Sequence, residues 1–427
     1  MSMKFRYSQG TVSTAICVLS FFGVVAYSED SGPDMYDGFT STRGGEGGRI
    51  IRVTTLESEG KGSLRNALWE KGPRIVVFEV GGVINLKGRS LNISEPFVTV
   101  AGQSAPEPGI TIIRGGIGVA THDVILQHLR VRPGDNGREK RSGWEPDGIS
   151  AYSGKAHDII VDHCSLTWAV DENLSVSGER LKGPEETAHR VTFSNCIIAE
   201  ALNDSSHSKG PHSKGSLVHD YCQDIAIIGN LYANNTRRNP FLKAHTTCVF
   251  VNNFIYNPGT AAIQMDYSEK EWKDAPVDPL PGRASITGNV LHHGLDTRTG
   301  LALVADRGAV WLHDNSVVPR KEEEGPITQG DIEELPDKPI WPQKLVSLPS
   351  TETVAHVTKN AGARPAERDD IDARIIRETV EGKGRIIDSQ EEVGGYPEHE
   401  STERKLDIPE DNISAWLNEM ARAVEEP

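Results

Sequence analysis

The sequence has no surplus of positive charge, and this absence excludes some partners. It contains 45 Lys and Arg against 61 Asp and Glu, which gives a net charge of −16 at pH 7. An acidic chain does not attract nucleic acid over its whole surface, so we expect no nucleic-acid partner. An acidic polymer would be repelled as well, and would need local cations or a bound metal ion to hold it.

Cysteine is scarce, and no two cysteines stand in a C-x-x-C pair. Five are present, and their spacing argues against a structural zinc site. Cys17 falls in the N-terminal leader. The other four are Cys164, Cys196, Cys222 and Cys248. In an exported protein they would form two disulfides, or they would be small thiols buried in a core, and the sequence leaves both readings open.

Long hydrophobic runs are absent beyond the N-terminus. Residues 11–26 are uncharged and mostly apolar, follow a basic start, and lead into a small-x-small pattern at residues 26–28. This arrangement predicts a signal peptide over residues 1–28 and therefore a secreted protein, extracellular or periplasmic. The run is short for a membrane anchor. We expect the mature chain to be a monomer that is not inserted in a membrane.

The middle of the chain lacks helical periodicity and repeats itself instead. Short β-rich runs such as HDIIVDHCSL (157–166) and QDIAIIGNLY (223–232) recur, each with a polar residue at a fixed place. Short strands at a repeat period predict a solenoid of stacked parallel strands. Asparagines stacked along its turns would hydrogen-bond to one another. The predicted polar row is His128, His163, Asn195, Asn230, Asn253, Asn289 and Asn315.

The chain divides into parts of different character. The predicted parts are a signal peptide (1–28), a disordered segment (29–43), the solenoid (44–318), and a linker with a C-terminal extension (319–427). A short helix over residues 63–69, with Ser63 near its N-cap, would cover the open end of the solenoid. Residues 319–353, rich in Pro, Glu and Asp, predict an extended linker or strap. Residues 369–380 and 412–424 predict amphipathic helices.

Charged residues fall at matching distances from the predicted polar row. Asp147 and Lys214 each lie 16 residues before a member of the row, and Asp171 and Arg238 each lie 8 residues after one. If every coil has the same geometry, all four share one strand position on coils about 4.8 Å apart. The pattern predicts carboxylates suited to a hard cation beside cations suited to a carboxylate polymer. A solvated face of balanced charges is the alternative.

These motifs resemble those of polysaccharide lyase family 1, the pectate lyases, from about Gly44 to Val318. The segments GGEGGRIIRVTTLESEGKGSLRNAL, DHCSLTWAVDENLS and HSKGSLV are similar to the family's N-terminal coils and central strands, and RNPFLK resembles its R-x-P-x-x-R signature. The tail is similar to that of bacterial secreted members. The resemblance implies an all-β fold, a right-handed parallel β-helix with a short N-terminal capping helix and a C-terminal extension that contains short helices.

The resemblance also implies a reaction. Family members cleave α-1,4-polygalacturonate, or pectate, by calcium-dependent β-elimination at C4–C5. By this resemblance Arg238 is the base that removes the C5 proton. Lys214 binds the substrate, and Lys243 takes the position of the second arginine of the signature, so it is assigned to substrate binding.

The cofactor implied by the resemblance is Ca²⁺. Asp147 and Asp171 match calcium ligands of the family, and Glu145 is a further candidate. Ser175 stands where the family usually has another carboxylate, four residues after Asp171. Two explanations stay open: Glu172 supplies the missing charge, or calcium binds well only once the substrate adds its own carboxylate.

Other functions remain open at this stage. A family 28 glycoside hydrolase would share the fold, but hydrolysis needs paired carboxylates, and no Asp-Asp pair follows on a later coil. A pectin lyase would lack the calcium carboxylates that Asp147 and Asp171 offer. The signal and the repeat fit equally well a catalytically weak β-helix that binds polysaccharide as an adhesin, or a lyase for another uronate polymer.

Overall fold

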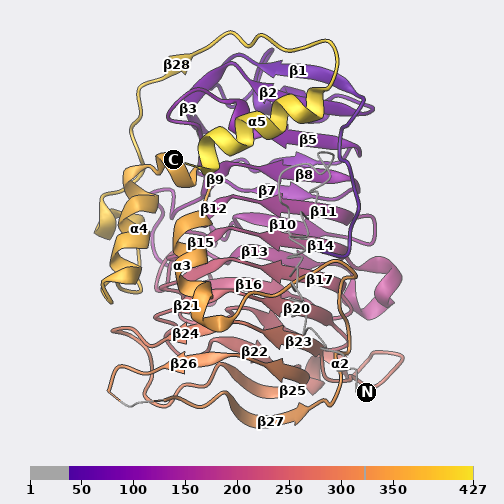
Figure 1. The fold of residues 1–427 in the computed structure, drawn as a ribbon, viewed down its shortest axis with the longest axis vertical. Coiled ribbons are helices and arrows are strands. Elements are labelled where there is room, and N and C mark those ends of the chain that lie inside the picture. Colours follow the sequence, from indigo (N-terminus) through magenta and orange to yellow (C-terminus); the bar gives the residue numbers. More distant parts are fainter. Residues whose placement is uncertain (1–37, 322–323, 427) are drawn as a thin grey trace, which may run out of the picture.

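Parallel strands stack coil on coil into a solenoid with three faces (Figure 1). The computed structural model describes residues 38–321 and 324–426, so the predicted signal peptide lies outside the described residues. The first face contains β1 (Arg49–Val53), β2 (Arg74–Phe78), β5 (Val98–Ala101), β8 (Val124–Gln127), β11 (His157–Asp162), β14 (His189–Ser194), β17 (Gln223–Ile228), β20 (Thr247–Val251) and β23 (Arg283–Thr287).

The other two faces follow the same parallel order. The second contains β4 (Leu91–Ile93), β7 (Ile117–Val119), β10 (Ile149–Tyr152), β13 (Glu172–Ser177), β16 (Lys214–Val218), β19 (Phe241–Leu242), β22 (Ile263–Met265) and β27 (Thr328–Glu334). The long β25 (Val304–His313) belongs to both of these faces. The third contains β3 (Val80–Asn85), β6 (Ile110–Ile113), β9 (Leu129–Arg132), β12 (Ser165–Thr167), β15 (Ile197–Ala199), β18 (Leu231–Ala233), β21 (Phe254–Tyr256), β24 (Val290–His292) and β26 (Ser316–Val318), with β28 (Thr402–Glu403) antiparallel to β3.

Helices lie at the end and along the outside of the solenoid. They are α1 (Leu64–Trp69), α2 (Glu269–Trp272), α3 (Ser350–Asn360), α4 (Asp370–Val380) and α5 (Ile413–Glu425), with single 3₁₀ turns η1 (Gly102–Ser104), η2 (Arg180–Lys182), η3 (Pro184–Glu186), η4 (Pro365–Glu367) and η5 (Gln390–Val393). The predicted N-cap of α1 is confirmed, because Ser63 Oγ accepts the Asn66 amide. None of the helices in the described part is long and apolar enough to cross a membrane.

The core runs the length of the solenoid because alternate strand residues point inward. On β20, Cys248 and Phe250 point into it, while Val249 and Val251 face outward and are covered by Leu345 and its neighbours. The four described cysteines are buried free thiols. Of the two readings of the cysteines, the structure therefore supports buried thiols.

The predicted polar row is partly wrong. Asn230, Asn253, Asn289 and Asn315 do stack, with each amide nitrogen donating to the next carbonyl oxygen at 2.9 to 3.1 Å. Strand pairing, however, places Asn230 opposite Cys196, so Asn195 lies one position earlier. His128 and His163 share that earlier row.

The physical reason is that two rows lie side by side at this corner. The first row holds the residues of the turn, which have φ between 44° and 68°; these are His128, His163, Asn195, Gly229, Asn252, Gly288 and Asp314. Gly, Asn and Asp tolerate that left-handed conformation best. The second row holds the buried asparagines. Because the two rows are adjacent, as in the dipeptide Gly229-Asn230, and both contain asparagines, the sequence alone does not show to which row a given asparagine belongs.

The C-terminal extension packs along two faces. Val357, Ile371 and Ile375 of α3 and α4 cover Ile197 and Phe254 on the third face. The longer predicted helices are confirmed as α4 and α5, whereas α3 and the strand β27, which pairs with β25, lie beside or within the stretch predicted as a linker.

Buried ion pairs anchor this extension. Arg132 of β9 holds Asp369 at 2.6 Å and Asp372 at 2.7 Å, all within the protein. At the other end of the chain, the predicted disorder of residues 29–43 does not extend to Thr40 and Thr42, which hydrogen-bond to aspartates of the first face.

Candidate active site

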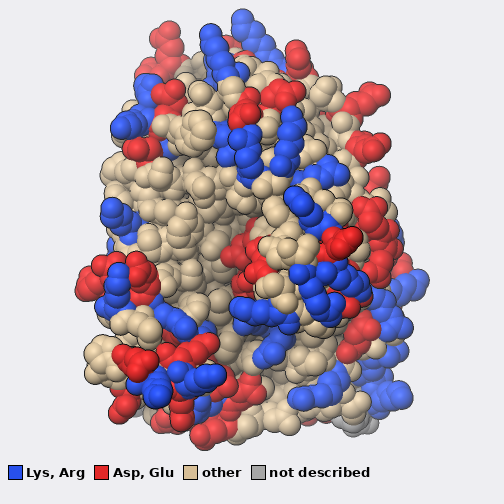
Figure 2. All heavy atoms as spheres, turned by 180° about the vertical axis from the view of Figure 1, so that it is seen from behind, with Lys and Arg blue, Asp and Glu red and all other residues tan. Residues whose placement is uncertain are grey.

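The second face carries a charged cleft of about 380 Å³. Figure 2 shows acidic and basic side chains gathered around a hollow midway along the solenoid. The cleft is lined by Asp147, Asp171, Glu172, Ser175, Ser177, Arg180, Lys209, Lys214, Leu217, His219, Arg238, Lys243 and Glu271. All of the residues predicted for the site line it except Glu145.

Strand register brings the charged residues together, with one correction. Glu172 of β13 pairs with Lys214 of β16. The pairing of Ile149 with Leu174 places Asp147 level with Glu172, and Lys214 bridges to the Arg237 backbone. The predicted register, which put Asp171 and Arg238 at this position, is therefore wrong by one residue on both coils.

The slip has two connected causes. The predicted register was counted from the polar row, in which His163 and Asn230 do not occupy equivalent positions. In addition, the Pro146 carbonyl accepts both the Val170 and the Asp171 amides, at 3.1 and 3.4 Å, so two residues face one just before β13. Glu172 thus takes the strand position, and Asp171 lies beside it.

Three carboxylates form the acidic half of the site. Oxygens of Asp147, Asp171 and Glu172 lie within 4.8 Å of one another. Asp147 accepts the Ser175 hydroxyl at 2.7 Å and the Glu172 amide at 3.2 Å. Burial, together with the charge of Asp171, raises the pKa of Asp147 to about 6. Burial and the same aspartate also raise the pKa of Glu172 well above its usual range.

The basic half of the site contacts these carboxylates directly. Lys214 Nζ lies 3.0 Å from Asp171 and 3.8 Å from Glu172, and Arg238 Nη1 donates to Glu172. Burial lowers the pKa of Lys214, against the effect of Glu172. Although burial acts in the opposite direction, the Lys214 ammonium lowers the pKa of Asp171. The Arg238 guanidinium also lies over the ring of Phe241, 5.3 Å from its centre.

Lys243 lies farther along the cleft and is already paired. Its ammonium is 2.6 Å from Glu271 and 3.2 Å from Asp220, and Arg180 joins the same two carboxylates. Burial acts to raise the pKa of Asp220, but its hydrogen bond with His219 and the charge of Lys243 lower this pKa overall. The sequence analysis missed this network because Glu271 arrives from α2, between coils.

Glu145 is placed at the edge of the acidic group. Its carboxylate accepts the Ser208 amide at 2.7 Å and lies 3.6 Å from His207 Nδ1. His207, in turn, stands 3.5 Å from Asp171 through Nε2, so a ring separates the two carboxylates.

His207 and His212 were not singled out from the sequence, although a signal is present. The tetrapeptide HSKG occurs twice, at 207–210 and at 212–215. The second copy supplies Lys214 to the cleft and the first supplies Lys209. The two imidazoles stack with their centres 3.3 Å apart, beside Asp171.

The donor set of the acidic group suits a hard cation. All three side chains offer carboxylate oxygens, which are the ligands that Ca²⁺ prefers. Burial and the neighbouring charge of Asp171 raise the pKa values of Asp147 and Glu172, so a bound cation would stabilise both carboxylates in their charged form. The residues present therefore fit a calcium ion.

Sequence comparison identifies relatives over most of the chain. A probable pectate lyase C from Emericella nidulans is 31% identical over 387 residues, which cover 87% of this chain and 81% of the relative. Another from Aspergillus oryzae is 30% identical over 384 residues, 87% of this chain and 82% of that one. A scan against protein-family profiles finds no match. These relatives are fungal, so the bacterial character expected from the tail stays a prediction.

Structural comparison supports the same fold. The crystal structure of jun a 1, the major allergen from cedar pollen, matches with a TM-score of 0.54 and 15% identity, covering 76% of this chain and 92% of that one. The predicted right-handed parallel β-helix is thereby confirmed. From the extent of the sequence match to the fungal proteins, the chain belongs to the pectate lyase family of polysaccharide lyases.

Proposed function

We propose that the chain is a secreted, calcium-dependent pectate lyase that cleaves polygalacturonate by β-elimination at C4–C5. The observation that carries the proposal is a charged row in which Asp147, Glu172 and Lys214 lie level on neighbouring coils and Arg238 follows on the next coil. These two carboxylates and two cations line one cleft. Carboxylates alone would repel an acidic polymer, and cations alone would offer no place for a metal ion.

Asp147, Asp171 and Glu172 would hold the calcium ion, and Glu145 would contribute from the edge of the group. When bound there, calcium would neutralise the carboxylate of the uronate and so make its neighbouring C5 proton more acidic. Ser175 offers a hydroxyl instead of a carboxylate and donates it to Asp147, which orients that side chain.

Arg238 is assigned as the base. Glu172 and the ring of Phe241 fix its guanidinium at the mouth of the cleft, with 21% of the side chain exposed to a substrate. A base at this place takes the C5 proton, the electron pair forms the C4=C5 double bond, and the C4–O bond breaks. The departing oxygen then takes up a proton, and no water is added.

Lys214 and Lys243 are assigned to substrate binding. Lys214 lies between the carboxylates and Arg238, where its ammonium would offset the charge that develops as the C5 proton leaves. Lys243 would bind a neighbouring uronate, in exchange with Glu271, whose side chain is 40% exposed. The partner is thus an acidic polysaccharide, and secretion is proposed from the signal-like residues 1–28.

The decisive experiment is an assay of the purified protein on polygalacturonate, with and without EDTA. We expect EDTA to abolish the activity and added Ca²⁺ to restore it. Mass spectrometry should find unsaturated ends without the mass of a water molecule. Full activity in chelator would overturn the calcium assignment, and products that carry an added water would indicate a hydrolase. Binding without cleavage would favour an adhesin.

A further inference from the structure

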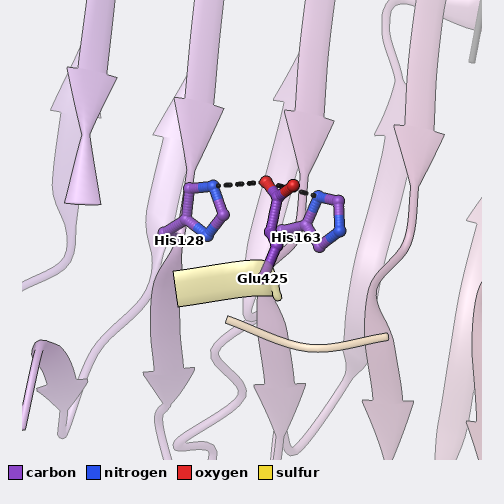
Figure 3. Close-up of side chains that lie close together, drawn as sticks. All are labelled: His128, His163 and Glu425. Atoms are coloured by element: carbon purple, nitrogen blue, oxygen red, sulfur yellow. Dashed lines mark ion pairs between the residues drawn. The ribbon is translucent and has the colours of Figure 1, made fainter. Parts of the chain in front are cut away.

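A second group of metal-ligand side chains lies away from the cleft, under the C-terminal helix. His128 and His163 occupy the turn row on successive coils, and their rings stack 5.3 Å apart at 14°. Glu425, from the last turn of α5, reaches between them (Figure 3). One donor atom of each residue lies within 4.8 Å of the others.

The hydrogen bonds of His128 leave one nitrogen aimed at a carboxylate. Its Nδ1 is 2.7 Å from the Ala363 carbonyl, which only accepts, so Nδ1 carries the proton. Its Nε2 therefore presents a lone pair, 3.2 Å from Glu425 Oε1. The His128 side chain is fully buried, and neither facing atom has a hydrogen-bond partner among the described residues. Two acceptors at this distance need a cation between them.

Two carboxylates, Asp162 and Glu425, lie beside these histidines, and two positive charges would neutralise them. Buried Asp162 accepts a hydrogen bond from His163 Nδ1 at 3.0 Å, so this nitrogen carries a proton in the metal-free protein, and Glu425 Oε1 lies 3.7 Å from it. Two stacked imidazolium ions would repel each other, whereas one divalent ion would balance both carboxylates.

We propose that His128 Nε2, His163 Nδ1 and Glu425 form a binding site for a divalent transition-metal ion of the zinc class, which takes the place of the proton on His163 Nδ1, releases that proton to solvent, and fastens α5 to the solenoid. Donors around a tetrahedral zinc ion at about 2.1 Å lie about 3.4 Å apart, close to the separations of 3.2 and 3.7 Å found here. The carbonyl on Nδ1 of His128 is the kind of outer partner that orients a ligating imidazole.

The group in the cleft provides the contrast. Asp171, His207 and His212 also lie within 4.8 Å of one another. There, His207 Nδ1 accepts the Lys209 amide, so its proton is on Nε2, the atom that faces Asp171. The Lys214 ammonium already occupies Asp171 at 3.0 Å. The carboxylate of this group therefore has a cation beside it, whereas no cation of the described residues lies between His128 Nε2 and Glu425 Oε1.

Calorimetric titration with zinc tests the proposal on the full-length chain, stripped with chelator and freed of calcium at neutral pH. We expect one zinc ion per chain. The variants Glu425→Gln and His128→Gln should weaken binding at least about tenfold while keeping the wild-type circular dichroism. His207→Gln and Asp147→Asn, which alter the cleft, should keep the stoichiometry and the affinity.

Replacing zinc by cobalt gives a second measurement, the visible absorption spectrum, which reports the coordination of the ion and not its affinity. The wild type should show the visible absorption of a four-coordinate cobalt site, and Glu425→Gln should lose it. Zinc binding that both variants retain would overturn the proposal, as would its loss in His207→Gln alone. Absence of zinc binding by the wild type would also overturn it, and would leave a proton as the cation between His128 and Glu425.

Discussion

Two rows of side chains cross the coils of this solenoid, and they differ in charge: one is made of neutral asparagines and the other of charged residues. The asparagine row, from Asn230 to Asn315, repeats one neutral group. Asn253 Oδ1 accepts both the amide and the side chain of Asn230 at 2.9 Å, and its Nδ2 donates to Asn289 at 3.1 Å. The charged row on the second face instead joins two carboxylates to two cations.

The rows also differ in how completely their polar groups are paired within the protein. Each interior asparagine finds its partners on the coils above and below, so nothing remains for a ligand and the row contributes only stability. In the charged row the pKa values of Asp147 and Glu172 are raised, because both carboxylates are buried and lie close to the charge of Asp171. A chain keeps such a local conflict where a ligand resolves it.

The largest expected effect is on catalysis, in the charged row. Arg238→Lys keeps the charge but changes the shape and reach of the base, so we expect kcat to fall about 10²- to 10⁴-fold. The change in KM should be modest and the fold unchanged by circular dichroism. The neighbouring Arg237→Lys is the matched control, because Arg237 bonds to Gln264 and does not line the cleft. The opposite result for the two variants would place the base one residue away.

The next effect is on stability, in the asparagine row. Asn253→Ala leaves buried partners on two coils unsatisfied and should lower the free energy of unfolding by about 2 to 4 kcal/mol in urea titrations. The folded variant should keep its kcat. Asn315→Ala, at the half-buried end of the row, should cost less. Equal losses at both positions would mean that the row does not act through its neighbours.

A neutral residue in the charged row should raise stability. Burial raises the pKa of Asp147, so the folded state binds a proton more tightly than the unfolded chain, and ionisation above about pH 6 costs stability. In chelator at pH 7.5, Asp147→Asn should therefore gain about 1 to 2 kcal/mol, and the gain should vanish near pH 4. Melting curves at both pH values check this, and a gain that persists at pH 4 would assign it to another cause.

The smallest effect is on calcium affinity. Ser175→Asp adds a carboxylate beside Asp147, where the hydroxyl now donates at 2.7 Å. We expect calcium to bind about tenfold more tightly and the calcium-free protein to be less stable, because like charges then crowd. Calorimetry measures both the affinity and the stoichiometry. Ser177→Asp, two residues along the same strand face, should change the affinity less, and equal gains would indicate a general charge effect.

Several features could be predicted from the sequence because they rest on local chemistry. The repeat of β-rich runs gave the solenoid, and Ser63 gave the cap of α1. The spacing of Asp147, Lys214 and Arg238 led to one cleft. The choice between Asp171 and Glu172 could not be made, because the two carboxylates are adjacent and the irregular backbone just before β13 decides which of them takes the strand position.

Contacts between distant segments were beyond the sequence signal. The sequence near Lys243 does not indicate Glu271, and the sequence near His128 does not indicate Glu425. Glu271 comes from an insertion between coils for which no element was predicted, and Glu425 follows a segment whose pattern predicts only a helix. The repeated tetrapeptide HSKG is visible in the sequence, but only the folded loop shows that both of its histidines lie beside Asp171.

The sequence by itself thus determined the coil, because a repeat that buries alternate residues has few other ways to satisfy its backbone. It also determined which residue types could bind a metal ion or a uronate. Only the tertiary structure decided which of them share a level, because register depends on bulges and left-handed turns such as those at Asp171 and Gly229. The last turn of α5 was placed in the same way, by packing between distant parts of the chain, which brought Glu425 next to His128 and His163 although no local pattern links these residues.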